Sequence, residues 1–221
     1  MNFDLEYFFG VFPGLIQKIP YTLYLGILAF MISIVLGGIL AALKKSRFLL
    51  VRKLAGLYIS FYRSTPYITQ LFLFYYGLPQ VIIPMRSISA EATLIVTISM
   101  NSAAFISENI RGALLSVDKG QIEAATSIGM NKFQTIKNIV LPQAIVTAIP
   151  TFGNTFVNMI KSTAMGFTIG VVELLARAKL GSSQSYCYLE SYVAVGFVYW
   201  GIVAVIDFLQ RRLENRVNRF M

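Results

Sequence analysis

The chain has 221 residues, of which 56% are hydrophobic and 13% are charged. Soluble domains carry about 25% charged residues, so this composition, together with a mean hydropathy of +0.66, indicates a membrane protein rather than a large soluble core. The chain has no histidine and a single cysteine, Cys187. These counts exclude an intramolecular disulfide, a zinc site with several Cys or His ligands, and catalysis through histidine.

Long apolar segments occur five times along the chain, and a helix needs roughly 20 such residues to cross a bilayer. We therefore predict an all-α, polytopic membrane protein that forms one domain over residues 1–221. Its five transmembrane helices are expected at about residues 19–43, 64–85, 90–112, 140–163 and 189–210. Most of the 19 basic residues follow the first, third and fifth of these segments. Because Lys and Arg are enriched on the cytoplasmic side, the N-terminus is predicted outside and the C-terminus in the cytoplasm.

Two further segments are not expected to cross the membrane. Residues 2–16 have the pattern of an amphipathic helix on the outer surface. The segment before the first crossing is not expected to be a signal peptide, because Asp4 and Glu6 stand where a basic leader would be. Residues 166–180 are predicted to form a broken or outer-facing helix beside the pathway. The net charge of +9 is explained by topology and by contact with anionic lipid head groups, so no nucleic-acid partner is expected.

The longest predicted cytoplasmic loop covers about residues 115–140. Asp118 can cap a helix there, with Gln121 three positions on, as in a capping box. Gly129 is placed to end that helix in a left-handed turn. A second short helix is expected over residues 131–139. The loop should therefore form a compact, bent knob of two short helices, which suits docking into a groove of a partner.

The same loop resembles the EAA loop of the permeases of ABC importers. That pattern is Glu-Ala-Ala, three residues, Gly, nine residues, Ile, one residue, and Leu-Pro. Every spacing is kept here, on Glu123, Ala124, Ala125, Gly129, Ile139, Leu141 and Pro142. The resemblance implies the fold of a type I importer, in which these residues form a coupling helix that inserts into a cleft of a separate ATPase.

The resemblance extends to nearly the whole chain. The sequences FYRSTP at residues 61–66, QLFLFYYGLP at 70–79, NSAAFISE at 101–108 and GVVEL at 170–174 are similar to segments of permeases for polar amino acids, with cystine-type permeases nearest. Two departures stand out. Ser64 replaces a glycine of many members, and Ser162 replaces an acidic residue. Without that carboxylate, a neutral or zwitterionic amino acid such as L-cystine is favoured over a strongly cationic one.

Polar side chains inside membrane spans are costly and often face a pathway or a partner helix. An amino acid needs donors for its carboxylate and acceptors for its ammonium group. The candidate pathway residues are Gln70, Tyr75, Asn101, Ser102, Ser107, Asn158, Lys161, Ser162 and Thr163, with Asn154 nearby. The alternative for most of them is hydrogen bonding between helices, and for Lys161 it is snorkelling to the membrane surface. Glu108 and Arg111, one helical turn apart, are expected to form a structural ion pair.

Five helices are too few to enclose a gated path, so a dimer of identical or related membrane subunits is predicted. The chain has no G-x-x-x-x-G-K-[ST] phosphate loop. We expect it to bind no cofactor itself, with ATP and Mg held by a partner. The resemblance implies two copies of a cytoplasmic ATPase, an extracytoplasmic amino-acid-binding protein, an amino-acid substrate, surrounding membrane lipid and a place in the bacterial cytoplasmic membrane.

Three other classes of protein compete with this interpretation. A passive channel or pore not coupled to ATP would need no coupling loop. An intramembrane enzyme would need a nucleophile and base, or metal ligands, at membrane depth, and the chain has no paired carboxylates within a span. An exporter of the same superfamily would usually lack the EAA loop. Co-purification with an ATPase separates the importer from all three.

Overall fold

The computed structural model describes residues 3–218, and this part of the chain contains helices and no strands. The predicted all-α fold is therefore confirmed. The α-helices are α1 (Leu5–Ile16), α2 (Ile19–Lys44), α3 (Leu49–Ser64), α4 (Tyr67–Phe72), α5 (Leu78–Val81), α6 (Ala90–Leu115), α7 (Lys119–Ser127), α8 (Lys132–Thr135), α9 (Leu141–Ser162), α10 (Leu174–Ser185) and α11 (Tyr188–Asn218). Short π-helical turns (Leu73–Gly77 and Ile136–Val140) and 3-10 turns (Ile83–Ser87 and Thr163–Ile169) join some of them.

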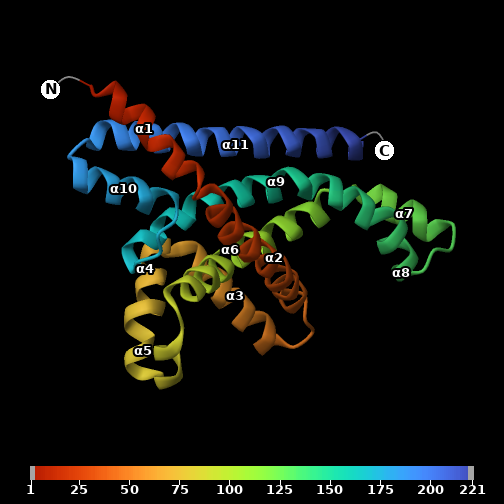
Figure 1. The fold of residues 1–221 in the computed structure, drawn as a ribbon. Helices are drawn as coiled ribbons and strands as arrows, with labels where there is room; N and C mark the ends of the chain where they lie inside the picture. The colour runs from red at the N-terminus through yellow and green to blue at the C-terminus, as the bar shows by residue number, and fades with distance from the viewer. Residues whose placement is uncertain (1–2, 219–221) are drawn as a thin grey trace.

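Figure 1 shows α9 and α11 lying alongside each other, with α7 and α8 protruding at one end of the molecule and α1 and α10 gathered at the other. Among residues 3–218, four helices are long and apolar enough to cross a membrane: Ile19–Lys44, Ala90–Leu115, Lys132–Ile169 and Tyr188–Val217. They correspond to the first, third, fourth and fifth predicted crossings.

The segment predicted to cross at residues 64–85 is not one straight helix. Thr65 is extended (φ −109°, ψ 144°) because Pro66 disfavours the helical conformation in the residue before it. Helical structure begins again at Tyr67, passes through the π-helical turn and ends at Val81. This helix is shorter than the four long ones, so a crossing in this segment stays a prediction.

The N-terminal helix was predicted over residues 2–16, of which Asn2 lies outside the described residues. Within them, α1 begins at Leu5 because the Asp4 carboxylate accepts a hydrogen bond from the Tyr7 amide at 2.9 Å. One face of α1 packs on α11, where the rings of Phe8 and Phe197 meet edge to face at 6.5 Å. The helix is therefore partly covered by protein rather than lying free on a surface.

The predicted break in residues 166–180 is confirmed. The 3-10 turn ends at Gly170, which has a left-handed conformation (φ 87°), and α10 begins at Leu174. The fully buried Glu173 carboxylate caps α10 through the Ala176 amide at 3.0 Å and accepts the Tyr199 hydroxyl at 2.8 Å. Burial raises the pKa of this carboxyl above its usual range. The hydrogen bond from Tyr199 fastens the broken segment to α11.

The pair α2 and α6 forms the centre of the bundle, and small residues bring the two backbones together. The Ser33 hydroxyl donates to the Ala29 and Ser99 carbonyls at 2.7 and 3.2 Å, and the Ser99 hydroxyl donates back to the Ala29 carbonyl at 3.2 Å. Gly37 lies against Ile106, so that a Cβ there would come within 2.6 Å of the Ile106 side chain and 3.0 Å of the Ala103 carbonyl. Helices associate through such close contacts in lipid, where the hydrophobic effect gives little driving force.

We therefore expect Gly37→Leu to lower the stability of the protein by about 1–3 kcal/mol through overpacking against α6. The matched control is Gly38→Leu, because a Cβ at Gly38 meets nothing within 4 Å. Thermal unfolding of both variants in detergent, followed by size-exclusion chromatography, measures the difference. Equal melting of the two variants would show that the close contact of α2 and α6 contributes little.

Candidate functional site: a polar cleft and a protruding knob

A cleft of about 460 Å³ lies between α6 and α9. Most of its lining side chains are amides or hydroxyls, and none of them is ionisable. They are Asn101, Ser102, Phe105, Asn109, Thr151, Asn154, Thr155, Asn158, Met159 and Ser162. Such a surface offers both hydrogen-bond donors and acceptors, and it suits a polar solute without net charge.

The structure brings four of the predicted pathway residues together in this cleft: Asn101, Ser102, Asn158 and Ser162. Asn109, Thr151 and Thr155 also line the cleft and were not among the predicted pathway residues. A signal for two of these existed, because Thr151, Thr155, Asn158 and Ser162 follow one another at helical spacing on a single face of α9. The Asn109 amide donates to the Thr155 hydroxyl at 3.1 Å, so this pair joins the two walls of the cleft.

Gln70 is almost fully buried, outside the cleft, and its amide links three helical segments. Its nitrogen donates to the Tyr62 carbonyl at 3.1 Å and to the Thr65 hydroxyl at 2.7 Å. Its oxygen accepts from the Asn101 amide at 2.9 Å, and that amide also donates to the Tyr62 carbonyl at 3.1 Å. In this conformation, Gln70 therefore makes hydrogen bonds between helices and does not line the cleft. The bonds also fix the side chain of Asn101, which lines the cleft.

The other four predicted pathway residues do not line the cleft. Tyr75 packs against the apolar cluster around Leu71 and Leu94. Ser107 is buried, and its hydroxyl makes no hydrogen bond with any described residue. Thr163 is buried and donates to the Ile160 carbonyl at 2.8 Å. Lys161 is exposed, away from the cleft lining. Successive helical residues point in different directions, so sequence proximity to Ser162 did not bring Lys161 into the cleft.

The predicted ion pair is confirmed and has a further member. Glu108 accepts from Arg111 at 2.8 Å and from Lys44 of α2 at 2.5 Å. The second cation could not be found from the sequence, because nothing in it shows that the end of α2 meets the end of α6. This triad joins the two central helices at the end of α6 from which the knob projects.

The knob consists of α7, a turn at Gly129 and α8. Asp118 begins α7 by accepting from the Gly120 amide at 2.7 Å, and the predicted capping box with Gln121 is wrong. A complete capping box occurs instead between Asn131 and Gln134 at the start of α8. Gly129 has φ of 84°, and the Met130 amide bonds to the Ala125 carbonyl at 3.1 Å. This is the left-handed glycine stop that the sequence predicted.

The second helix of the knob is not separate from the next crossing. It continues through a π-helical turn into α9, so that Lys132–Ile169 forms one long helical element. The turn lies directly before Leu141 and Pro142, and Pro142 has no amide hydrogen to donate. A π-helical turn accommodates this interruption without ending the helix. The helix predicted over residues 131–139 is therefore present, but it does not end there and continues into the next crossing.

Part of the surface of the knob is apolar and exposed. Ile128 is 77% exposed and Phe133 is 72% exposed, and Ile122 and Ile136 are also exposed. Exposed clusters of large apolar side chains mark interaction sites. Among the motif residues, Glu123, Ala124, Gly129, Leu141 and Pro142 are exposed, Ile139 is half-buried and Ala125 is buried.

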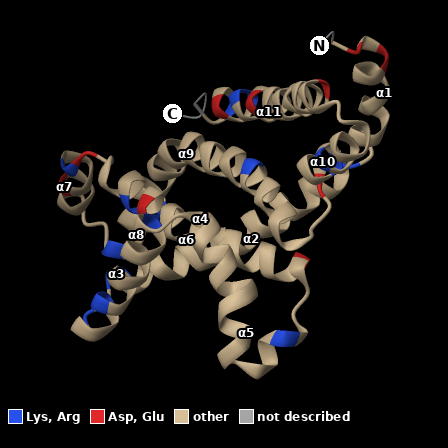
Figure 2. Cartoon of the chain, turned by 90° about the vertical axis from the view of Figure 1, so that its left-hand side faces the viewer, with Lys and Arg blue, Asp and Glu red and all other residues tan. Residues whose placement is uncertain are grey.

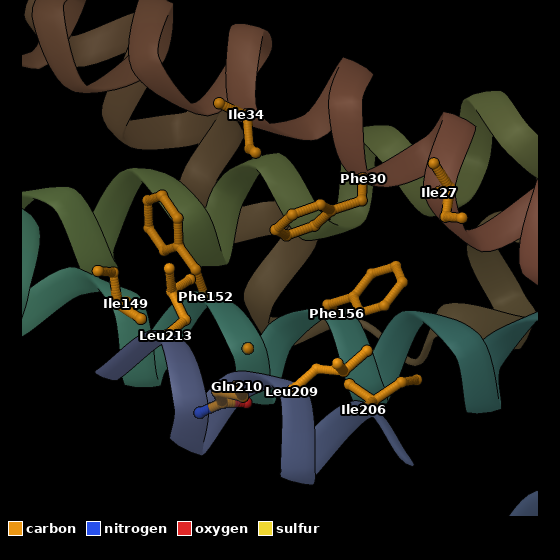
Figure 3. Close-up of a pocket in the computed structure, with 11 residues that line it drawn as sticks. Ile27, Phe30, Ile34, Ile149, Phe152, Phe156, Ile206, Leu209, Gln210 and Leu213 are labelled. Atoms are coloured by element: carbon orange, nitrogen blue, oxygen red, sulfur yellow. The ribbon is translucent and has the colours of Figure 1, made fainter. Parts of the chain in front are cut away.

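A second groove, of about 450 Å³, lies between α2, α9 and α11 (Figure 3). Phe30, Phe152, Phe156 and Leu209 are among its lining residues, and Gln210 is the only one with a polar side chain. This groove offers almost no hydrogen-bonding partner, so it does not suit a polar solute.

Comparison with known proteins adds to this geometry. Residues 33–219 match the family model described as binding-protein-dependent transport system inner membrane component. The chain is 43% identical to the probable amino-acid permease protein YxeN of Bacillus subtilis, over 98% of this chain and 96% of that one. It is 35% identical to the L-cystine transport system permease protein TcyL of the same organism, over 98% and 92%. A crystal structure described as an amino acid ABC transporter with histidines superposes with a TM-score of 0.90 at 32% identity, over 98% of this chain and all of that one.

Proposed function

Because this chain belongs to the family of binding-protein-dependent transport system inner membrane components, we propose that it forms half of the solute pathway of an ATP-driven importer, with L-cystine as the first candidate substrate. The chain is a multi-pass inner-membrane permease subunit of an amino-acid ABC transporter, and it is not itself an enzyme. It has the fold of a type I importer permease. The substrate, the coupling residues and the assembly are proposals.

One observation carries the proposed coupling: α8, the second helix of the knob, and one wall of the cleft belong to the same long helical element. Phe133 lies on the knob, and Thr151, Asn158 and Ser162 line the cleft further along Lys132–Ile169. A displacement of the knob would therefore move this wall. The apolar knob surface supports docking of an ATPase subunit, with Glu123 to Ala125 in the coupling helix and Gly129 holding its bend. A passive pore that is not coupled to an ATPase would not need an exposed apolar knob.

The assembly we propose has a second permease subunit, identical or related, two ATPase subunits and an extracytoplasmic amino-acid-binding protein. A two-fold dimer would give the cleft a second wall on the symmetry axis. The N-terminus would lie outside, and the C-terminus and the knob in the cytoplasm. ATP and Mg would be bound by the ATPase and no cofactor by this chain. Closure of the ATPase pair on ATP would swing α9 and turn the pathway from inward-facing to outward-facing.

The chemistry of the cleft supports a zwitterionic or neutral substrate. Its lining has no carboxylate to attract a cationic side chain and no basic group to attract an anionic one. Asn101, Asn158 and Ser162 could share hydrogen bonds with the carboxylate and ammonium groups of an amino acid. L-cystine meets these conditions, and TcyL, named as part of an L-cystine transport system, is similar over nearly the whole chain.

The bend of the knob gives the first test. We expect Gly129→Val to abolish substrate-dependent ATP hydrolysis by the reconstituted importer, because a β-branched residue is strained at φ of 84°. Gly129→Asn is the matched control, since asparagine tolerates the left-handed conformation, and it should keep most of the activity. Full coupling in the valine variant would contradict the proposed role of the bend.

The cleft gives the second test. Ser162→Asp places a carboxylate in the lining, and we expect it to raise the affinity for arginine relative to L-cystine by about tenfold, which is about 1.4 kcal/mol. Ser183→Asp on the exposed surface of α10 serves as the control. Competition by a panel of amino acids for uptake into proteoliposomes, with the cognate binding protein present, measures the change. An unchanged panel would place substrate selection outside this cleft.

A further inference from the structure

Helix α3 has two exposed faces of opposite character, and nothing in the proposed transport cycle accounts for either. Its inward face is well fixed. Ala55, Ile59 and Tyr62 are buried against the central helices, and the Tyr58 hydroxyl donates to the Met100 carbonyl of α6 at 2.9 Å. The direction of the two outward faces is therefore set by the fold.

The first exposed face is an apolar stripe. Leu50, Leu54, Leu57 and Phe61 follow one another at intervals of four, three and four residues, which places them on one side of the helix. Their side chains are between 44% and 69% exposed. Together they form a row of large hydrocarbon groups along the length of α3 that no described residue covers.

The second exposed face is cationic. Arg52 and Lys53 are exposed on α3, and Lys45 and Arg47 precede it. Arg63, at the other end of α3, is not part of this face, because its guanidinium lies over the Phe105 ring of the cleft at 5.8 Å. The chain has no acidic residue between Glu6 and Glu91, and Figure 2 shows basic residues and no acidic residue along α3. These four cations form no ion pair with any residue from 3 to 218.

We propose that the first half of α3 lies at the membrane surface and binds anionic phospholipid, with its apolar stripe among the acyl chains and its cations at the phosphate groups. A helix with one apolar and one cationic face is the form that binds such surfaces. The ion pair between Lys44 and Glu108 places the start of α3 beside the end of α6, on the side of the knob. This inference does not depend on which amino acid is transported.

A second copy of the chain is a less suitable occupant of the stripe. A two-fold contact through this face would be isologous, so it would bring the cations of one α3 close to those of the other, with no carboxylate on either helix to offset the repulsion. Anionic lipid satisfies both faces of the helix at the same time.

The test uses the single tryptophan of the chain. Trp200 is replaced by phenylalanine and Leu57 by tryptophan, and the full-length variant is reconstituted into vesicles of phosphatidylcholine with a minority of phosphatidylglycerol. Bromine is placed on the acyl chains of one lipid or the other. We expect brominated phosphatidylglycerol to quench the tryptophan fluorescence several-fold more than its fraction of the total lipid would give. The reason is that each cation near the surface raises the affinity for anionic lipid about fivefold.

Arg52→Gln with Lys53→Gln should lower the quenching by brominated phosphatidylglycerol several-fold toward its bulk share, with Lys45 and Arg47 still in place. Arg211→Gln with Arg212→Gln, on the exposed end of α11, should leave it unchanged. Native mass spectrometry of the same purified proteins gives a second readout, with fewer bound phosphatidylglycerol molecules after the α3 changes than after the α11 changes. Quenching by both lipids in proportion to their amounts would overturn the proposal. Absence of quenching, with disulfide-linked dimers of a Leu57→Cys variant, would overturn it in favour of a second copy.

Discussion

The long helical element from Lys132 to Ile169 is the constraint on which the rest of the structure depends. It begins in a knob covered with exposed apolar side chains and continues as the wall of a polar cleft. A helix transmits displacement along its axis because each backbone hydrogen bond spans one turn. The two interruptions, a π-helical turn before Pro142 and the internal Pro150, leave it helical throughout. The cleft wall on α9 and the α8 half of the knob are thereby parts of one helical element.

Some helices around this element are held together by close contacts and hydrogen bonds, and others leave space for a solute. Close contacts between α2 and α6, the bonds of Gln70 to α3 and α6, and the Glu108 triad hold the opposite wall. The α9 wall is joined to α6 in the cleft through Asn109 and Thr155, and its neighbour α11 packs closely at Gly153, where a Cβ would collide with Gln210. The Gln70 amide and the Glu108 carboxylate are bonded to other helices, whereas the Asn154 and Asn158 amides of the cleft make no hydrogen bond with a described residue and leave donors and acceptors for a solute.

Much of this organisation could be predicted from the sequence, because membrane crossings and helix ends are encoded locally. Four of the five predicted crossings are long apolar helices, and the stop at Gly129 and the pair of Glu108 with Arg111 are as expected. The predictions that failed depend on tertiary neighbours or on competing local signals. Pro66 delays the helix predicted from residue 64 so that it begins at Tyr67, and the capping box occurs at Asn131 rather than at Asp118.

The pathway residues show the same limit. These residues were predicted because their polar side chains fall within membrane spans. That criterion selected Gln70, Ser107 and Thr163 together with Asn158 and Ser162. The first three are buried in contacts between or within helices, and only the packing of α6 on α9 separates the two groups. Lys44 could not be assigned to Glu108 for the same reason, since the two residues are far apart in sequence.

The central claim is that knob and cleft wall move together, and pulsed EPR distances in the complex with its ATPase test it most directly. With Cys187 replaced by serine, one pair of spin labels goes on Phe133 and Asn154, and a second pair on Asn154 and Ser60 of α3. On ATP binding the account predicts an unchanged distance within the first pair and a shifted distance within the second. A changed distance between positions 133 and 154, with a constant distance between 154 and 60, would contradict it.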